Sequence, residues 1–181
     1  MNLPNAISIG RFLTVPVMIW LIAVEQYAVG FWLFVAAGVS DAVDGFIAKR
    51  FDRQTAIGAY LDPIADKALL MAVYVMLGLN DAVPDWLVIL VVFRDLSIGG
   101  GMLLLIGLTG PRRIVPLRVS KLNTVVQILL AAVALGDLAI VPVPAAIMDG
   151  LIYATAATTV ASGLAYGRLL IGVGADLENL P

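Results

Sequence analysis

Long apolar stretches alternate with short polar connections along the whole chain. Windows of about 20 apolar residues, the length that a helix needs to cross the hydrocarbon core of a bilayer, recur along it. Their approximate bounds are 6–24, 28–49, 59–79, 86–108, 119–139 and 145–171. The pattern predicts an all-α, polytopic membrane protein with six transmembrane helices. No repeat period is evident, so we expect residues 1–181 to form a single membrane domain.

The first apolar stretch is expected to be a retained span. It lacks the basic start and the small-residue cleavage site of a secretory signal peptide, and further hydrophobic stretches follow it. An Arg- and Ser-rich transit peptide is also absent, which favours a prokaryotic plasma membrane. The residues before Arg11 are alternatively a short amphipathic helix that lies along the membrane interface.

Composition supports this fold class and narrows the chemistry. Charged residues make up 13% of the chain and hydrophobic residues 61%, whereas soluble domains carry about 25% charged residues. The chain contains no Cys and no His, which excludes thiolate chemistry and disfavours a zinc site. A general base must therefore be a carboxylate, or less readily a Lys or Tyr, and a metal site must use oxygen ligands.

Basic residues gather on one side of the predicted membrane topology. If the N-terminus is cytoplasmic, every Lys and Arg except Arg94 falls on the cytoplasmic side, as the positive-inside rule requires. On the opposite side all charged residues are acidic, and they are Glu25, Asp81, Asp85, Asp137 and Asp149. We therefore expect a multi-pass protein of the bacterial cytoplasmic membrane with its polar site at the cytoplasmic face.

Four carboxylates interrupt the apolar pattern at the facing ends of the second and third stretches. Asp41 and Asp44 are spaced i,i+3 and Asp62 and Asp66 i,i+4, so each pair shares a face if these segments are helical. A short connection brings the two pairs to one end of the molecule. Carboxylates at close quarters repel in a poor dielectric, and one or two divalent cations would relieve this. Mg²⁺ fits well, because it takes oxygen ligands and substrate phosphates.

Basic and small residues border these carboxylates. We place Lys49, Arg50 and Arg53 in the adjoining loop, where they suit a phosphate-bearing ligand, although alone they would be ordinary membrane anchors. Gly45 and Gly58 remove side chains beside the Asp groups, which permits either close helix packing or the approach of a flat ligand. A single intramembrane Asp is often structural, but four at one depth indicate function.

The spacing of these residues resembles a family signature. The CDP-alcohol phosphatidyltransferases carry D-x-x-D-G-x-x-A-R-x8-G-x-x-x-D-x-x-x-D, and their layout also has six spans. This chain reads Asp41-x-x-Asp44-Gly45-x-x-Ala48-Lys49, eight residues, Gly58-x-x-x-Asp62-x-x-x-Asp66. Lys49 stands where the family has Arg. Lys and Arg bind phosphate differently, so either Lys49 or Arg50 is the candidate for the family's Arg role.

The resemblance implies the transfer of a phosphatidyl group from a CDP-linked lipid such as CDP-diacylglycerol to an acceptor hydroxyl, with release of CMP. It implies two divalent metal ions, Mg²⁺ or Mn²⁺, held by Asp41, Asp44, Asp62 and Asp66. Asp66 would also be the general base. The residues that it places near the CDP-lipid are Asp41, Gly45, Ala48, Lys49, Arg50 and Gly58. It further implies a homodimer among membrane lipids, and no nucleic-acid partner is expected.

The second half of the chain is expected to hold the acceptor. Arg94 lies inside the fourth stretch next to Asp95. Adjacent residues on a helix do not face each other, so we expect the partner of Arg94 elsewhere, either a lipid phosphate or one of the clustered Asp residues. The basic loop that follows is alternatively a headgroup anchor. The residues expected near the acceptor are Lys67, Arg94, Arg112, Arg113, Arg118, Lys121 and Asn123.

The start of the fifth stretch carries a polar face. Ser120, Asn123, Thr124 and Gln127 fall on one side of a helix. Together with the Arg94–Asp95 pair, this segment is similar to the eukaryotic-type cardiolipin synthases of the family, whose acceptor is phosphatidylglycerol. Transfer to glycerol 3-phosphate, which gives phosphatidylglycerol phosphate, is the alternative. An ion-coupled transporter is a distant alternative. Such proteins usually show internal repeats and midplane sites, whereas no repeat is evident in this sequence and its Asp residues are expected toward one face.

Overall fold

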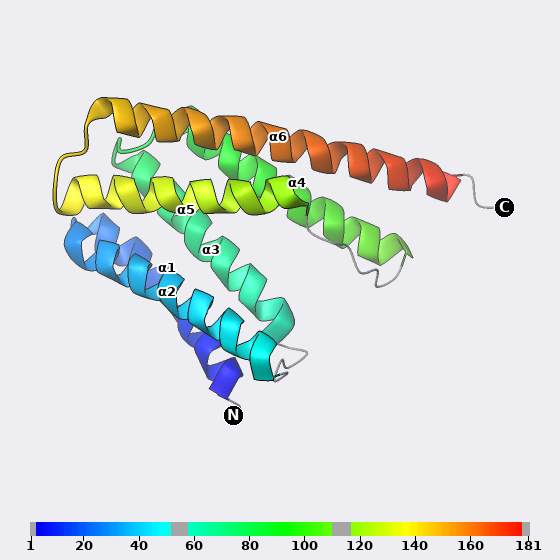
Figure 1. The fold of residues 1–181 in the computed structure, drawn as a ribbon, viewed down its shortest axis with the longest axis horizontal. Coiled ribbons are helices and arrows are strands. Elements are labelled where there is room, and N and C mark those ends of the chain that lie inside the picture. The colour runs from blue at the N-terminus through cyan, green and yellow to red at the C-terminus, as the bar shows by residue number, and fades with distance from the viewer. Residues whose placement is uncertain (1–2, 52–57, 110–116, 179–181) are drawn as a thin grey trace. The chain divides into compact units, whose positions relative to one another are not determined.

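The structure is all-α. The computed structural model describes the backbone of residues 3–51, 58–109 and 117–178, and side chains at 10, 12–41, 64–104, 107 and 117–169. Six helices and no strand occupy these residues (Figure 1). In chain order they are α1 (Leu3–Ala23), α2 (Tyr27–Phe51), α3 (Gly58–Leu79), α4 (Asp85–Thr109), α5 (Arg118–Ala139) and α6 (Ala145–Glu178). The predicted fold class is confirmed.

Helices of both units are apolar, and three of them have the length of membrane spans over their described residues. Among the described residues, three stretches are long and apolar enough to cross a bilayer: Asp85–Leu104, Arg118–Ala139 and Ala145–Leu169. Shorter apolar runs occupy Phe12–Ala23 and Tyr27–Asp41. Large apolar side chains on every helix are exposed to the surroundings, which is typical of a surface that faces lipid. The prediction of a polytopic membrane protein is therefore confirmed.

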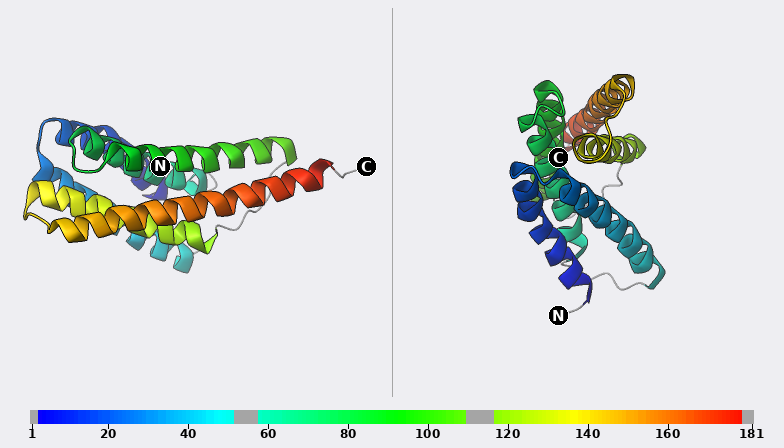
Figure 2. Two further views of the ribbon diagram at one scale, coloured as in Figure 1. Left: turned by 90° about the horizontal axis from the view of Figure 1, so that it is seen from above. Right: turned by 90° about the vertical axis from the view of Figure 1, so that its left-hand side faces the viewer.

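Three helix bounds differ from the sequence expectations. α1 begins at Leu3 and is continuous, so residues 3–11 do not form a separate interfacial helix. α2 continues through Phe51, because Lys and Arg at its end are good helix formers. α6 runs to Glu178, beyond the expected end near 171 (Figure 2). Its 34 residues span about 50 Å, which exceeds the roughly 30 Å of a hydrocarbon core.

The chain forms two compact units. Unit 1 contains α1, α2, α3 and the part of α5 from Ala131 onward. Unit 2 contains α4, the first part of α5 up to Leu130, and α6 from Ala146. Each unit is described by itself below. The single membrane domain over 1–181 stays a prediction.

The core of unit 1 lies where α1 packs against α3 and α2. Met18 and Ile22 of α1 and Tyr74 of α3 are fully buried. Gly30 of α2 faces α1, since a Cβ there would lie 3.8 Å from both Ile22 Cγ1 and Met18 Sδ. A Cβ at this position would make ordinary van der Waals contact with α1, so Gly30 lies directly against that helix. Tyr27 Oη donates a 2.9 Å hydrogen bond to Oδ1 of Asn80, which ties the start of α2 to the end of α3.

Two helices of unit 1 end in the same way. Glu25 follows α1 with φ 60°, and Asp81 follows α3 with φ 55°. After α3, the amide of Asp81 donates to the carbonyl of Gly78 and the amide of Ala82 to that of Leu77, both at 2.9 Å. These bonds form a Schellman motif, which satisfies the last carbonyls of a helix through a residue in the left-handed region. Acidic residues thus occupy positions that usually favour glycine.

The core of unit 2 is partly polar. Leu87 and Val91 of α4 are buried, and so is Arg94 on the same face. The buried polar residues of the other two helices in this unit are Asn123, Gln127, Thr155, Thr159 and Ser162. Polar side chains between membrane helices act as specific contacts, because apolar packing alone distinguishes poorly between lipid and protein. Unit 2 is therefore organised by hydrogen bonds as well as by shape.

Candidate functional site

The carboxylates of the signature lie on the ends of two antiparallel helices of unit 1. Asp41 lies in the second half of α2, and Asp66 lies near the start of α3. Both are half-buried. The end of α2 and the start of α3 are at the same end of this unit, since the two helices run in opposite directions (Figure 1). A carboxylate that is partly shielded from water is suited to bind a divalent cation.

For the second Asp of each sequence pair, the structure describes only the backbone. Asp44 belongs to α2 and Asp62 to α3, so the helical spacing within each pair is as expected. The side chains of Asp44 and Asp62 lie outside the described part of the structure. The gathering of all four carboxylates around one metal site therefore stays a prediction.

The residues expected near the CDP-lipid are also placed by backbone alone. Gly58 is the first residue of α3. Gly45, Ala48, Lys49 and Arg50 all belong to α2, and their side chains lie outside the described residues. The expectation that Lys49 and Arg50 are in a loop is wrong, because α2 includes both. Lys49 and Arg50 lie five and six residues beyond Asp44 on the same helix, about one and a half turns along it. Arg53 lies outside the described residues.

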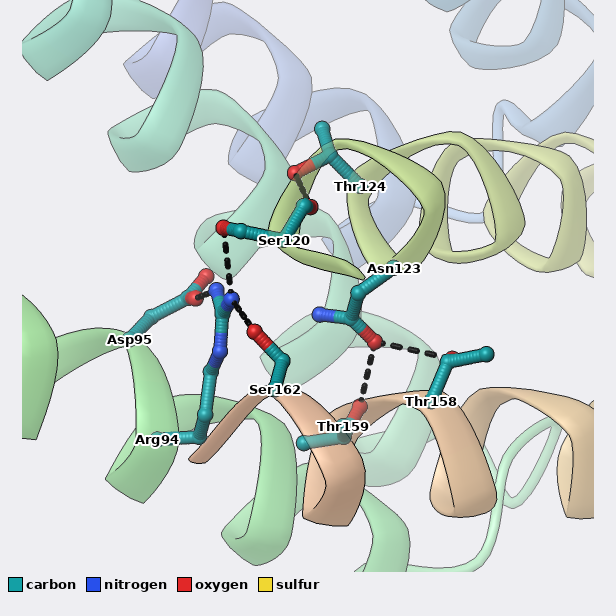
Figure 3. Close-up of polar contacts among 8 residues, drawn as sticks. All are labelled: Arg94, Asp95, Ser120, Asn123, Thr124, Thr158, Thr159 and Ser162. Carbon is teal, nitrogen blue, oxygen red and sulfur yellow. Dashed lines mark hydrogen bonds and ion pairs between the residues drawn. The ribbon is translucent and has the colours of Figure 1, made fainter. Parts of the chain in front are cut away.

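Arg94 is held by three helices of unit 2 (Figure 3). Its Nη1 donates to Oδ1 of Asp95 at 2.5 Å. Its Nη2 donates to Oγ of Ser120 at 2.8 Å and also to Oγ of Ser162. The side chains of Arg94 and Asp95 are each 4% exposed. Arg94 is therefore enclosed by protein groups rather than presented to a headgroup.

The ion-pair partner of Arg94 differs from the expectation. We expected a lipid phosphate or one of the clustered carboxylates, because neighbouring residues on a helix point in different directions. The structure shows an ion pair with Asp95 instead. The long side chain of Arg94 allows its guanidinium to turn back toward the adjacent carboxylate, and burial in a membrane protein makes such a pairing favourable.

Asn123 joins α5 to α6. Its side chain is fully buried, and its Oδ1 accepts hydrogen bonds from Oγ1 of Thr158 and Oγ1 of Thr159, each at 2.9 Å (Figure 3). The predicted polar face of α5 therefore faces other helices. Asn123 was expected near the acceptor, but these contacts indicate an internal role.

The other acceptor candidates differ in their exposure. Arg118 and Lys121 lie in the first turn of α5 and are exposed. Lys67 follows Asp66 on α3 and is half-buried. Arg112 and Arg113 lie outside the described residues. Among the described candidates of unit 2, Arg118 and Lys121 are the two basic side chains that a headgroup can reach.

The polar residues of α6 were not predicted from the sequence. Thr155, Thr159 and Ser162 are fully buried, and they recur at spacings of four and three residues. This spacing puts them on one helical face, and it was the available signal. Small hydroxyl residues are common in membrane helices, which is why the pattern did not stand out.

Comparison with known proteins identifies the family. Residues 1–162 match the family model described as CDP-alcohol phosphatidyltransferase. A cardiolipin synthase (CMP-forming) from Homo sapiens is 32% identical over 97% of this chain and 64% of its own length. A probable cardiolipin synthase (CMP-forming) from Drosophila melanogaster is 32% identical over 92% of this chain and 56% of its own length.

A relative with a different printed activity is also similar. The chloroplastic CDP-diacylglycerol–glycerol-3-phosphate 3-phosphatidyltransferase 1 of Oryza sativa subsp. japonica is 38% identical over 75% of this chain and 46% of its own length. The chain thus spans about half to two thirds of the length of these curated relatives. The match to the family model covers most of the chain and includes every signature position, with Lys49 in place of the family's Arg. The chain belongs to the CDP-alcohol phosphatidyltransferase family.

Proposed function

We propose that this chain is an enzyme that moves the phosphatidyl group of CDP-diacylglycerol onto a hydroxyl of phosphatidylglycerol, giving cardiolipin and CMP. The observation that carries this proposal is the extent of similarity. Relatives named as cardiolipin synthases align with 91 to 97% of the chain. Relatives named as glycerol-3-phosphate phosphatidyltransferases align with 55 to 75% of it. The cardiolipin synthases therefore match the acceptor half of the chain as well as the signature.

Asp66 is the proposed general base. The acceptor hydroxyl attacks the phosphorus of the phosphatidyl group while Asp66 takes the hydroxyl proton. A phosphorus–oxygen bond to the acceptor forms, and the phosphorus–oxygen bond to CMP breaks. A carboxylate is the available type of base at the signature, because the chain has no His and no Cys. The half-buried position of Asp66 supports this role.

The metal site proposed here consists of oxygen ligands. Asp41, Asp44 and Asp62 would hold Mg²⁺ or Mn²⁺, and Asp66 would contribute to a second ion. Bound ions of this type neutralise diphosphate charge and stabilise a leaving phosphate. The half-buried carboxylates Asp41 and Asp66 fit such an ion, because carboxylate oxygens are the hard donors that these ions take.

The CDP-lipid would lie against the end of α2 and the start of α3. Gly45 and Gly58 leave room for the cytidine and the diphosphate, with Ala48 as a small neighbour. Lys49 or Arg50 would neutralise a phosphate from the last turns of α2. The acceptor would meet Arg118 and Lys121, whose exposed positions at the start of α5 suit the single phosphate of phosphatidylglycerol. Lys67, Arg112 and Arg113 remain proposed contributors.

The second candidate function uses glycerol 3-phosphate as the acceptor and gives phosphatidylglycerol phosphate. It is favoured by the higher identity, 38%, of the relative from Oryza sativa subsp. japonica. A soluble dianionic acceptor needs a strongly basic pocket that is open to water, whereas phosphatidylglycerol needs access from the lipid phase. Membership of a transferase family sets the transporter alternative aside.

We further propose a homodimer with its active site at the cytoplasmic face of the membrane. The one-sided distribution of Lys and Arg supports this orientation. The bacterial cytoplasmic membrane is the proposed location. The eukaryotic cardiolipin synthases among the relatives weigh against this particular membrane, but they do not bear on the orientation.

An acceptor comparison tests the proposed function. The purified chain is incubated with labelled CDP-diacylglycerol and Mg²⁺ or Mn²⁺, with phosphatidylglycerol and glycerol 3-phosphate offered in parallel reactions. We expect labelled cardiolipin from phosphatidylglycerol and little product from glycerol 3-phosphate. Phosphatidylglycerol phosphate as the main product would select the second candidate instead.

A further inference from the structure

Arg94 is a charged residue that the proposed chemistry does not use. It is 5% exposed and its guanidinium contacts groups from α4, α5 and α6 of unit 2 (Figure 3). An unpaired charge inside a membrane protein is costly, and Asp95 cancels the charge of Arg94 within one ion pair. The pair is neutral as a whole, which makes it a poor site for an anionic phosphate.

The contacts of Arg94 hold the first turn of α5. Ser120, which accepts from Nη2 of Arg94, lies between Arg118 and Lys121 in the sequence. Both of these basic side chains are exposed. Because Ser120 belongs to the same helical turn, its position determines where the two basic side chains stand.

Asn123 provides a second contact between α5 and α6, next to the contacts of Arg94. We call this line of polar contacts between the two helices the seam. Arg94 joins Ser120 to Ser162 through a shared Nη2, and Asn123 bonds directly to Thr159. The residue number rises by three along α5, from 120 to 123, and falls by three along α6, from 162 to 159. This is the register of two antiparallel helices.

The register predicts a further step. Gln127 on α5 and Thr155 on α6 follow at the next four-residue interval, and both are fully buried. The seam is thus polar for about two helical turns from the first turn of α5 inward. Arg94 is at the outer end of this seam and brings α4 into it.

We propose that Arg94 is a positioning residue for the acceptor. Neutralised by Asp95, it ties the first turn of α5 to α6 through Ser120 and Ser162, and it thereby fixes Arg118 and Lys121 where the acceptor phosphate binds. This inference rests on the proposed function for the identity of the acceptor, but the tie itself does not.

Two variants separate positioning from direct phosphate binding. Ser162→Ala removes one partner of Arg94 and leaves the ion pair intact. Arg94→Gln leaves the buried carboxylate of Asp95 without its counter-charge, whereas Arg94→Gln/Asp95→Asn restores a neutral pair that can still form hydrogen bonds. If Arg94 bound the phosphate by its charge, the double variant would be as impaired as the single one.

Kinetics of the purified full chain in lipid nanodiscs give the first readout. We expect Ser162→Ala to raise the KM for phosphatidylglycerol at least about fivefold, the effect of one lost hydrogen bond to a charged group. The KM for CDP-diacylglycerol should stay within about twofold. Arg94→Gln/Asp95→Asn should have a lower KM for phosphatidylglycerol than Arg94→Gln. Ser97→Ala, at an exposed position of α4, is the matched control and should resemble the wild type.

A distance measurement gives a readout that needs no activity. The chain has no Cys, so spin labels at Leu122→Cys and Leu164→Cys report α5–α6 spacing without background. Both positions are exposed. We expect a broader distance distribution in Ser162→Ala than in the wild type or Ser97→Ala. An unchanged distribution, an unchanged KM for phosphatidylglycerol in Ser162→Ala, or no recovery in the double variant would overturn the proposal.

The two readouts also distinguish this proposal from the proposed function. If the wild type makes phosphatidylglycerol phosphate instead of cardiolipin, the proposed acceptor is wrong, and the same KM comparison is made with glycerol 3-phosphate. The label distances then still decide whether Arg94 and Ser162 hold α5.

Discussion

Asp66 and Arg94 are charged residues in different surroundings. Arg94 is enclosed in a 2.5 Å ion pair with the neighbouring Asp95 and by two serine hydroxyls, so its charge is cancelled inside unit 2. Asp66 is half-buried near the start of α3, in a segment that carries further carboxylates. Four carboxylates gathered at one site, as proposed, would repel one another and favour a bound cation, whereas a neutral ion pair has no such need. Asp66 is therefore suited to chemistry, and Arg94 to structure.

The role of Asp66 as a base predicts a large loss of activity on substitution. Asp66→Asn keeps the size of the side chain but cannot accept the hydroxyl proton. We expect transfer to fall by about 10² to 10⁴-fold, the contribution of a general base, with the fold retained. CMP release by the purified variant measures the effect. Asp149→Asn, at an exposed position on the opposite side of the predicted topology, is the control. Unimpaired CMP release in Asp66→Asn would rule out this base.

The signature residues were found from the sequence because their chemistry depends on spacing along the chain. Asp41 and Asp66 stand out as charges in apolar stretches, and helical periodicity relates each to its pair. The contacts of Arg94 could not be found in this way. They depend on the register between α5 and α6 and on the direction that a flexible side chain takes.

Among the properties of the helices, the sequence predicted the starts of the second to sixth helices best. The expected starts at 28, 59, 86, 119 and 145 lie within one residue of the observed ones, because polar and Pro-containing connections interrupt the apolar pattern. The late end of α6 was missed, since helix formation continues after the apolar residues stop. For the seam between α5 and α6, the sequence predicted the polar face of α5 but not the polar residues of α6 that contact it.

The Schellman end of α3 makes a testable element. Asp81 adopts φ 55°, a region that costs a side chain about 1 kcal/mol or more and costs glycine little. Asp81→Gly should therefore raise the free energy of unfolding by about 0.5 kcal/mol. Thermal or SDS-induced unfolding measures the change. Asp85→Gly is the control with the opposite sign, because an acidic residue in the first turn of α4 is favourable. A destabilised Asp81→Gly variant would contradict the proposed cost.

The tie between α5 and α6 predicts a coupling energy. Asn123 accepts from Thr159 inside unit 2, so Asn123→Ala and Thr159→Val should not be additive. A double-mutant cycle on the free energy of unfolding should give about 0.6 kcal/mol and at most about 1.7 kcal/mol, the average and the maximum for hydrogen bonds between membrane helices. Thr14→Val, whose hydroxyl donates to the carbonyl of Gly10 in its own helix, is the control partner and should be additive with Asn123→Ala. Additivity of the first pair would show that the tie contributes nothing.

At the scale of the whole molecule, the carboxylate signature and the polar seam lie in different compact units. The signature is carried by unit 1, which contains α2 and α3, and the seam by unit 2, which contains α4 and α6. The proposed reaction draws on residues of both units. That the first half of the chain binds the CDP-lipid and the second half binds the acceptor stays a proposal.

Metal dependence follows from the proposed site. Removal of divalent ions by EDTA should abolish transfer, and Mg²⁺ or Mn²⁺ should restore it, because the proposed cluster of carboxylates would need a cation to bind a diphosphate. The control is Ca²⁺, which is larger and accepts more ligands in looser geometry, and it should restore less activity. Full activity after exhaustive chelation would contradict the proposed metal site.

Stoichiometric transfer tests the central claim most directly. The purified wild-type chain receives CDP-diacylglycerol labelled in its phosphatidyl group, together with phosphatidylglycerol and Mg²⁺, and cardiolipin and CMP are quantified by mass spectrometry over time. The account predicts equal amounts of labelled cardiolipin and CMP in the wild type, and at least about 10²-fold less of both products in Asp66→Asn. CMP release without transfer of the label to phosphatidylglycerol, or cardiolipin without CMP, would contradict it.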